Sequence, residues 1–132
     1  MTRIESNITP VNKSAADVFA FLSDFNNFKS LMPEQVVDWE STPDECSFKI
    51  KGMATLGMKM VEKTPVSLIK ITSNGKVPFN FFLSCHIQED GTASKVQLAF
   101  DAELNAMMKM MAVKPLTNFL NLLAGKLSEL MM

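Results

Sequence analysis

The sequence contains no tyrosine, one tryptophan, one histidine and two cysteines among its 132 residues. It therefore has few of the side chains that usually carry acid–base or metal chemistry. Its longest apolar run is Val18–Leu22, far short of the roughly 18 residues that a membrane-spanning helix needs. Thirteen basic and fourteen acidic residues nearly cancel, which gives no general attraction to nucleic acid or to anionic membranes. We expect no nucleic-acid partner and no integral membrane association.

Targeting signals are also scarce. The residues after Met1 alternate with charges and do not form the apolar core of a secretory signal, so we expect a cytoplasmic protein. In that compartment Cys46 and Cys85 should be buried thiols and not a disulfide.

The apolar content is high: 47% of the residues are hydrophobic, with 11 methionines and 10 phenylalanines. This length predicts a single domain over residues 1–132. Ile4 and Ile8 alternate with polar residues up to Pro10 and predict a first strand. Ser14 and Asp17 form a capping box, after which apolar side chains at helical spacing predict a short helix, followed by a second short helix that Pro33 ends.

From Gln35 to Leu104 the apolar period is two, and each break is a turn signal. Asn74-Gly75 and Asp90-Gly91 are the strongest hairpin dipeptides, because both central residues of a type I′ turn need positive φ. Six consecutive strands, together with the N-terminal one, predict a seven-stranded antiparallel sheet.

The C-terminal region predicts a long amphipathic helix that begins with Pro115 in its first turn. Its apolar stripe comprises Leu116, Phe119, Leu120, Leu123, Leu127, Leu130 and Met131. Gly125 inside it either permits a close approach or is a tolerated defect. The preceding segment, Met107–Met111, fits a mobile lid at a cavity mouth, a buried first helical turn or an oligomer contact.

This order of elements resembles the helix-grip proteins of the START / Bet v 1-like (SRPBCC) superfamily, and within it the bacterial polyketide-cyclase/dehydrase-like group. The resemblance rests on the opening strand, on residues Pro10–Asp24 and Asn27-Phe28, and on Met32-Pro33. It implies an α+β fold in which a curved seven-stranded sheet grips the C-terminal helix, with two short helices after the first strand. It also implies an elongated, mostly apolar cavity between sheet and helix.

Strand parity identifies the side chains that face inward, because alternate residues point to opposite faces. The same residues would also make a solid core. The resemblance favours a cavity, and the adaptable methionine side chains support it weakly. The predicted ligand-binding residues are Met58, Met60, Phe79, Phe81, Leu83, Phe100, Ala102, Met107, Met108, Met111, Leu116, Phe119, Leu120 and Leu123.

Catalytic candidates are weak. His86 and Cys85 are adjacent on a strand and so point to opposite faces, which excludes a nucleophile–base pair. Asp101 and Glu103 share the outward parity. Glu62 is in phase with Met58 and Met60 and is the single candidate for an acid at the cavity mouth, although it also fits the place where the strand leaves the core. No zinc, phosphate-loop or hydrolase motif occurs, so we expect no metal and no cofactor.

Three functions remain in view. The leading hypothesis is a non-enzymatic binding or carrier domain for a small hydrophobic molecule, lipid-like or aromatic. The second is an enzyme similar to polyketide cyclases or aromatases that uses the same cavity. The third is a protein-interaction module of the chaperone-activator type, and a homodimer is a further partner to test.

Overall fold

An eight-stranded antiparallel sheet forms most of the computed structural model, which describes residues 2–51, 55–75, 77 and 79–131. The sheet order is β1-β8-β7-β6-β5-β4-β3, and β2 also pairs with β8. The strands are β1 (Thr2–Glu5), β2 (Thr9–Val11), β3 (Val36–Ser41), β4 (Glu45–Ile50), β5 (Thr55–Thr64), β6 (Leu68–Ser73), β7 (Phe81–Asp90) and β8 (Ala93–Ala102).

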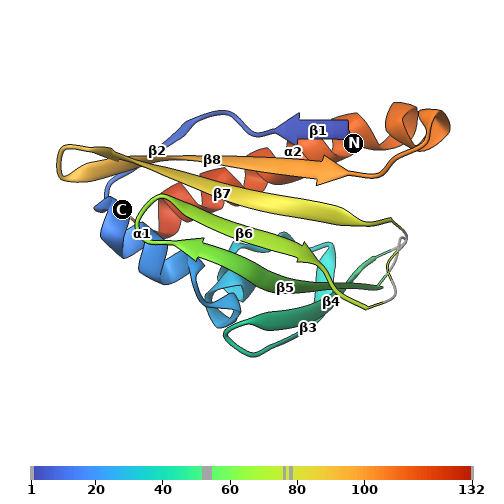
Figure 1. Cartoon of the computed structure of the whole chain (residues 1–132), viewed down its shortest axis with the longest axis horizontal. Coiled ribbons are helices and arrows are strands. Elements are labelled where there is room, and N and C mark those ends of the chain that lie inside the picture. Colours follow the sequence, from blue (N-terminus) through green and yellow to red (C-terminus); the bar gives the residue numbers. More distant parts are fainter. Residues whose placement is uncertain (1, 52–54, 76, 78, 132) are drawn as a thin grey trace.

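The helices lie on one side of this curved sheet, and α2 (Ala106–Leu130) runs behind it in Figure 1. It packs against β1, β2 and β8, while α1 (Ala15–Leu22) packs against β6, β7 and β8. A 3-10 helix, η1 (Phe25–Leu31), packs beside α1 and α2. This is the predicted α+β helix-grip fold. In the described part of the chain no helix is long and apolar enough to cross a membrane.

The strand count is eight and not seven because the N-terminal strand is interrupted at Ser6. The Ser6 amide donates to the Leu98 carbonyl at 2.8 Å, but the Leu98 amide donates to the Ser6 hydroxyl at 2.9 Å. A side chain thus replaces the carbonyl in the ladder. The parity changes beyond this point, so Ile4 is buried whereas Ile8, predicted on the same face, is 62% exposed.

The first helix has the predicted cap: the Ser14 hydroxyl accepts from the Asp17 amide at 3.2 Å. The sequence pattern predicts the second short helix over Phe28–Met32. It is a 3-10 helix that begins at Phe25, because the Asp24 carboxylate caps it by accepting from the Asn26 amide at 2.8 Å.

The predicted hairpin at Asp90-Gly91 exists, but its register differs by one residue. Asp90 pairs with Ala93, so the central turn residues are Gly91 and Thr92. Only Gly91 has positive φ, 64°, which is the pattern of a type II′ turn. Between β6 and β7 the connection spans residues 74–80, longer than the tight turn expected at Asn74-Gly75.

The start of α2 also corrects the sequence prediction. The helix begins at Ala106, nine residues before Pro115, and the Asn105 side chain caps it by accepting from the Met108 amide at 2.8 Å. Pro115 lies inside the helix and not in its first turn. Because proline has no amide proton, the helix lacks one backbone hydrogen bond at this position.

Candidate functional site

The inner faces of β7 and β8 form the apolar wall that strand parity predicts. Phe81, Leu83 and Cys85 on β7 are buried, as are Leu98 and Phe100 on β8. The Phe81 and Phe100 ring centroids are 4.9 Å apart, and the Phe79 ring lies 6.0 Å from Phe81 and 6.3 Å from Phe100. Phe79 and Phe81, from one stretch of the chain, thus meet Phe100 of β8 at one end of the sheet.

The structure brings most of the predicted ligand-binding residues together in or beside one apolar cluster. Fully buried members of that prediction are Met58, Phe81, Leu83, Phe100, Ala102, Leu120 and Leu123. Half-buried members packed against the cluster are Met60, Phe79, Leu116 and Phe119. This is equally the arrangement of an ordinary core, so their ligand-binding role stays a prediction.

Met107 and Met111 are predicted to line the ligand cavity, but the structure places both side chains on the surface. Both side chains are 72% exposed, and neighbouring Met110 is 87% exposed. The first turns of α2 extend beyond the end of β8 (Figure 1), so no strand covers them. Met108 is half-buried but lies outside the apolar cluster. The methionine segment is therefore the exposed beginning of α2, and not a buried first turn.

A half-buried apolar rim lies where α2 leaves the sheet. The β7 and β8 ends are joined there, because the Glu103 amide donates to the Asn80 carbonyl at 3.0 Å. The rim consists of partly exposed side chains that pack against the core: Phe79, Leu104, Val113, Leu116 and Phe119. Here partly exposed apolar side chains of α2 pack against the buried core.

Side chains fill the middle of the interior. Phe81, Leu83 and Phe100 are only 2%, 5% and 8% exposed, which leaves little water-sized space beside them. The two clearest hollows lie elsewhere: one of about 420 Å³ on the outer face of the sheet, and one of about 520 Å³ beside Pro33–Gln35 and Lys51. In this conformation the space between sheet and helix is closed at its centre.

The inner wall carries no activated nucleophile. Burial raises the pKa of the Cys46 and Cys85 thiols to about 12, so both remain protonated near neutral pH. Both cysteines are free, as the sequence predicts. Among the described residues, no group of three or more His, Cys, Asp or Glu side chains is arranged to hold a metal ion.

Glu62 does not point toward the interior, contrary to its predicted phase with Met58 and Met60. Met60 pairs with Ile71 but Glu62 pairs with Lys70, so Val61 is an extra residue in β5. This bulge reverses the parity and turns Glu62 to the outer face, where its Oε2 accepts from the Thr64 hydroxyl at 2.9 Å. His86 is also exposed on the outer face, as parity predicts.

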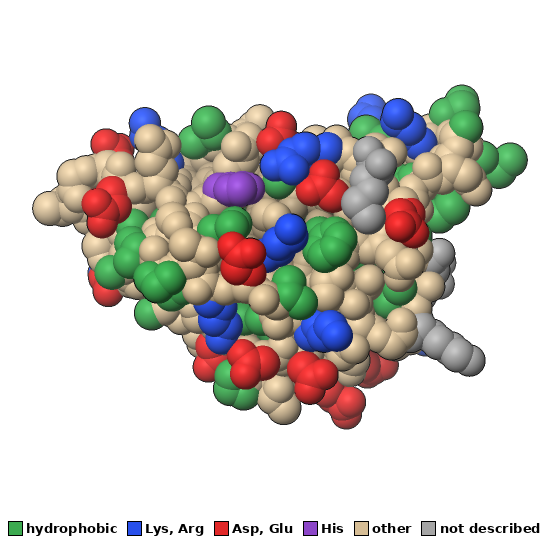
Figure 2. Space-filling view, in the orientation of Figure 1, with side chains coloured by type: hydrophobic (Ala, Val, Ile, Leu, Met, Phe, Trp, Pro, Cys, Tyr) green, Lys and Arg blue, Asp and Glu red, His purple; other side chains and the backbone are tan. Residues whose placement is uncertain are grey.

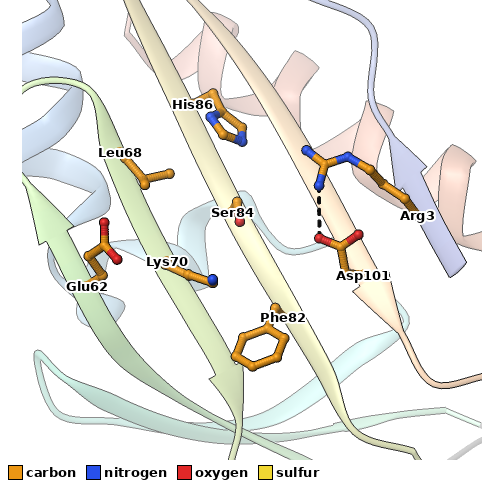
Figure 3. A pocket seen from close by; sticks show the side chains of 8 residues that line it. All are labelled: Arg3, Glu62, Leu68, Lys70, Phe82, Ser84, His86 and Asp101. Carbon is orange, nitrogen blue, oxygen red and sulfur yellow. Dashed lines mark hydrogen bonds and ion pairs between the residues drawn. The ribbon is translucent and has the colours of Figure 1, made fainter. Parts of the chain in front are cut away.

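The outer hollow is a feature that sequence reasoning missed. It is lined by Arg3, Glu62, Leu68, Lys70, Phe82, Ser84, His86 and Asp101 (Figure 3). Strand parity places Ser84 on the same outer face as His86, but Ser84 is only 7% exposed because longer side chains surround it. The available signal was Phe82, a large aromatic residue that shares the outer parity with Asn80, Ser84 and His86.

The sheet order and the long C-terminal helix packed against the sheet define a helix-grip protein. The chain belongs to the family described as polyketide cyclase / dehydrase and lipid transport, whose model matches residues 1–129. No curated protein sequence matches it.

Solved structures show the same fold at low sequence identity. A START superfamily protein from Mycobacterium smegmatis is 16% identical with a TM-score of 0.72, covering 97% of this chain and 98% of its own. Norcoclaurine synthase from Thalictrum flavum, in complex with dopamine and hydroxybenzaldehyde, is 16% identical with a TM-score of 0.72, covering 98% and 85%. The di-domain ARO/CYC BexL of the BE-7585A biosynthetic pathway is 12% identical with a TM-score of 0.76, covering 98% of this chain and 46% of BexL.

Proposed function

We propose that the protein binds or carries a small hydrophobic molecule, lipid-like or aromatic, which enters between α2 and the sheet at the apolar rim. The observation that carries this proposal is the half-buried rim itself, which joins solvent to the buried aromatic wall. An apolar ligand that covers Leu116 and Phe119 removes their remaining exposed surface from water, which favours binding by roughly 25 cal/mol per Å².

Entry to the centre requires movement, because the interior is closed. The first half of α2, residues 106–115, contains no buried residue and ends at Pro115, so it is the part that can move at the lowest cost. The ligand then replaces contacts that the rim side chains make with each other. The family's description, which includes lipid transport, is consistent with this role.

A carrier is favoured over a cyclase-type enzyme by the chemistry of the wall. Among the buried inner-face residues of β7 and β8 that the structure describes, Cys85 is the one titratable group, and burial raises the pKa of its thiol to about 12. Glu89 shares this strand parity but is exposed at the far end of β7. Acid–base catalysis needs a group that exchanges protons near the working pH.

Binding of N-phenyl-1-naphthylamine, a neutral dye that fluoresces in apolar surroundings, tests the proposal. Leu116→Glu places a carboxylate in the rim and should weaken dye binding more than about tenfold, because a charge cannot be buried there without a partner. Leu122→Glu is the matched control, since Leu122 is 54% exposed on the same helix. It should leave the dye affinity unchanged within about twofold, the range of a surface substitution.

Equal weakening by both variants, or no saturable binding by the parent chain, would contradict the proposal. Leu116→Ala is the second variant in case the glutamate disturbs folding. Glu62→Gln should bind dye like the parent chain, because Glu62 lies on the outer face. Recovery of natural ligands unchanged after prolonged incubation, followed by mass spectrometry, supports a carrier, whereas conversion supports the cyclase-type alternative.

A further inference from the structure

We propose that the outer hollow is a second binding site, for a small molecule that carries a carboxylate or phosphate group on an aromatic or apolar body. This site lies on the face of the sheet opposite α2, so the inference is independent of ligand binding at the apolar rim. Figure 2 shows this face, with the single histidine (purple) beside basic and acidic side chains.

The hollow exists because small residues occupy the middle of the outer face. Ser84 on β7 pairs with Ala99 on β8 and with Lys70 on β6. Ala99 is 0% exposed and Ser84 is 7% exposed, although both belong to the outer face. Long side chains on the surrounding strands stand above them, so the Ser84 hydroxyl forms the floor of a basin of about 420 Å³.

The floor carries a hydrogen-bonding group. Ser84 is 7% exposed, and its hydroxyl is not among the fully buried polar atoms of the described residues that lack a partner, so it is open to the hollow that the residue lines. Buried polar groups usually have a partner, and a hydroxyl that opens into a hollow can take one from a ligand. A ligand oxygen is the natural partner because the hydroxyl can donate to it.

The basin is lined by two basic and two acidic side chains, and Lys70 is the basic one that can meet a ligand anion. Arg3 neutralises Asp101, since its Nη1 lies 3.0 Å from the carboxylate, and the Arg3 Nε lies 3.3 Å from Glu5. Lys70 has no carboxylate within 4.0 Å among the described residues, although Glu62 is its cross-strand neighbour. Instead, its ammonium group lies 4.9 Å from the centroid of the Phe82 ring.

Figure 3 shows how these groups lie around Ser84. The Lys70 ammonium group extends across the basin, the His86 ring lies on the far side of Ser84, and the Glu62 carboxylate turns aside toward Leu68. The Lys70 ammonium group and the Ser84 hydroxyl can each donate to an oxyanion, and charge-assisted hydrogen bonds are the stronger kind. Phe82 and Leu68 offer apolar surface to the rest of the ligand. The chemistry thus fits an oxyanion joined to an apolar body.

NMR titration of the full chain labelled with nitrogen-15 tests this inference. The probes are benzoate and phenyl phosphate, with benzamide as the uncharged match to benzoate. Either anion should give saturable shifts of the amides around Lys70 and Ser84, and benzamide should not. The anion that binds with the lower Kd shows whether the site prefers a carboxylate or a phosphate group.

Variants separate a built site from general surface charge. Lys70→Met should raise the Kd of the bound anion about tenfold, the equivalent of one charge-assisted hydrogen bond, and Ser84→Ala should raise it less. Lys95→Met is the control, because Lys95 is an exposed lysine of β8 that does not line the hollow. The absence of saturation, shifts that gather elsewhere, or equal weakening by Lys95→Met would overturn the inference. Neutral-dye binding should remain unchanged in Lys70→Met, so failure of this site is distinguishable from failure of the rim site.

Discussion

The two halves of α2 differ although they form one continuous helix. Residues 116–130 contain all of its buried side chains, Leu120, Leu123, Ala124 and Leu127, whereas residues 106–115 contain none. The C-terminal half is also tied to the N-terminal strands: the Asn7 amide donates to Asn121 Oδ1 at 2.8 Å, and the Ser128 hydroxyl donates to the Pro10 carbonyl at 2.8 Å. The N-terminal half presents Met107, Met110 and Met111 to solvent.

This difference shows that α2 combines a part anchored by buried side chains and a part that has no fully buried side chain. Pro115 lies at the junction and removes a backbone hydrogen bond there. Local opening is easiest where few apolar contacts are buried. The apolar rim lies at this same junction, so the helix can admit a ligand without releasing its C-terminal grip.

The largest expected effect is the difference in reactivity between a thiol buried under the sheet and a thiol on the exposed first turns of α2. Cys85 and Cys46 are protonated at pH 8 because burial raises their pKa to about 12. An exposed thiol has a pKa of about 8.5, so Met110→Cys should add one thiol that reacts with Ellman's reagent roughly a thousandfold faster than the native two. Rapid reaction of the native thiols in the folded parent chain would show that the sheet interior is open.

The same thiols predict a loss of stability at high pH. Their pKa is raised in the folded chain relative to the usual 9.0, so the folded state holds protons that the unfolded state releases. The free energy of unfolding should therefore be maintained below pH 9 and fall as the pH rises toward 12. Cys85→Ala should flatten this decline, which urea unfolding at several pH values would measure. An equally steep decline in the variant would assign it to other groups.

Shortening a side chain to alanine should lower the free energy of unfolding much more in residues 116–130 of α2 than in residues 106–115. Leu123→Ala removes a side chain that is 4% exposed and should lower the free energy of unfolding by about 2–5 kcal/mol. Met110→Ala removes one that is 87% exposed and should change it by less than about 0.5 kcal/mol. Urea denaturation followed by circular dichroism measures both. A large loss from Met110→Ala would mean that the methionines are covered, for example in a homodimer.

A small gain in stability is expected from a substitution on the solvent side of residues 116–130. A Cβ at Gly125 would meet no other atom within 4 Å, so this glycine is a tolerated helix defect and not a point of close approach. Gly125→Ala should raise the free energy of unfolding by about 1 kcal/mol. Gly57→Ala is the contrasting control, because its Cβ would clash with the Asn74 carbonyl oxygen. A destabilising Gly125→Ala would indicate an additional contact on that face of α2.

Much of the fold follows from local periodicity. Alternation placed Phe81, Leu83, Cys85 and their β8 neighbours on the inner face, and the spacing from Leu116 to Leu127 marked the gripped face of α2. These assignments hold because a buried face tolerates no change of register.

The errors have local physical causes that a periodic pattern does not contain. One extra residue, Val61, reversed the parity of Glu62, and the Ser6 hydroxyl in the ladder divided the first strand. Pro115 predicts a helix start because its usual place is the first turn, but it lies inside α2. The outer hollow depends on the heights of side chains from neighbouring strands around Ser84, which sequence order alone does not reveal.

Amide hydrogen exchange of α2, with and without N-phenyl-1-naphthylamine, tests the central claim most directly. The account predicts that amides of residues 106–115 exchange faster than those of residues 120–128 in the free protein. It also predicts that bound dye slows exchange around Val113, Leu116 and Phe119 while the C-terminal half changes little. Uniform exchange along α2, or dye-induced protection confined to the C-terminal half, would contradict entry at the apolar rim.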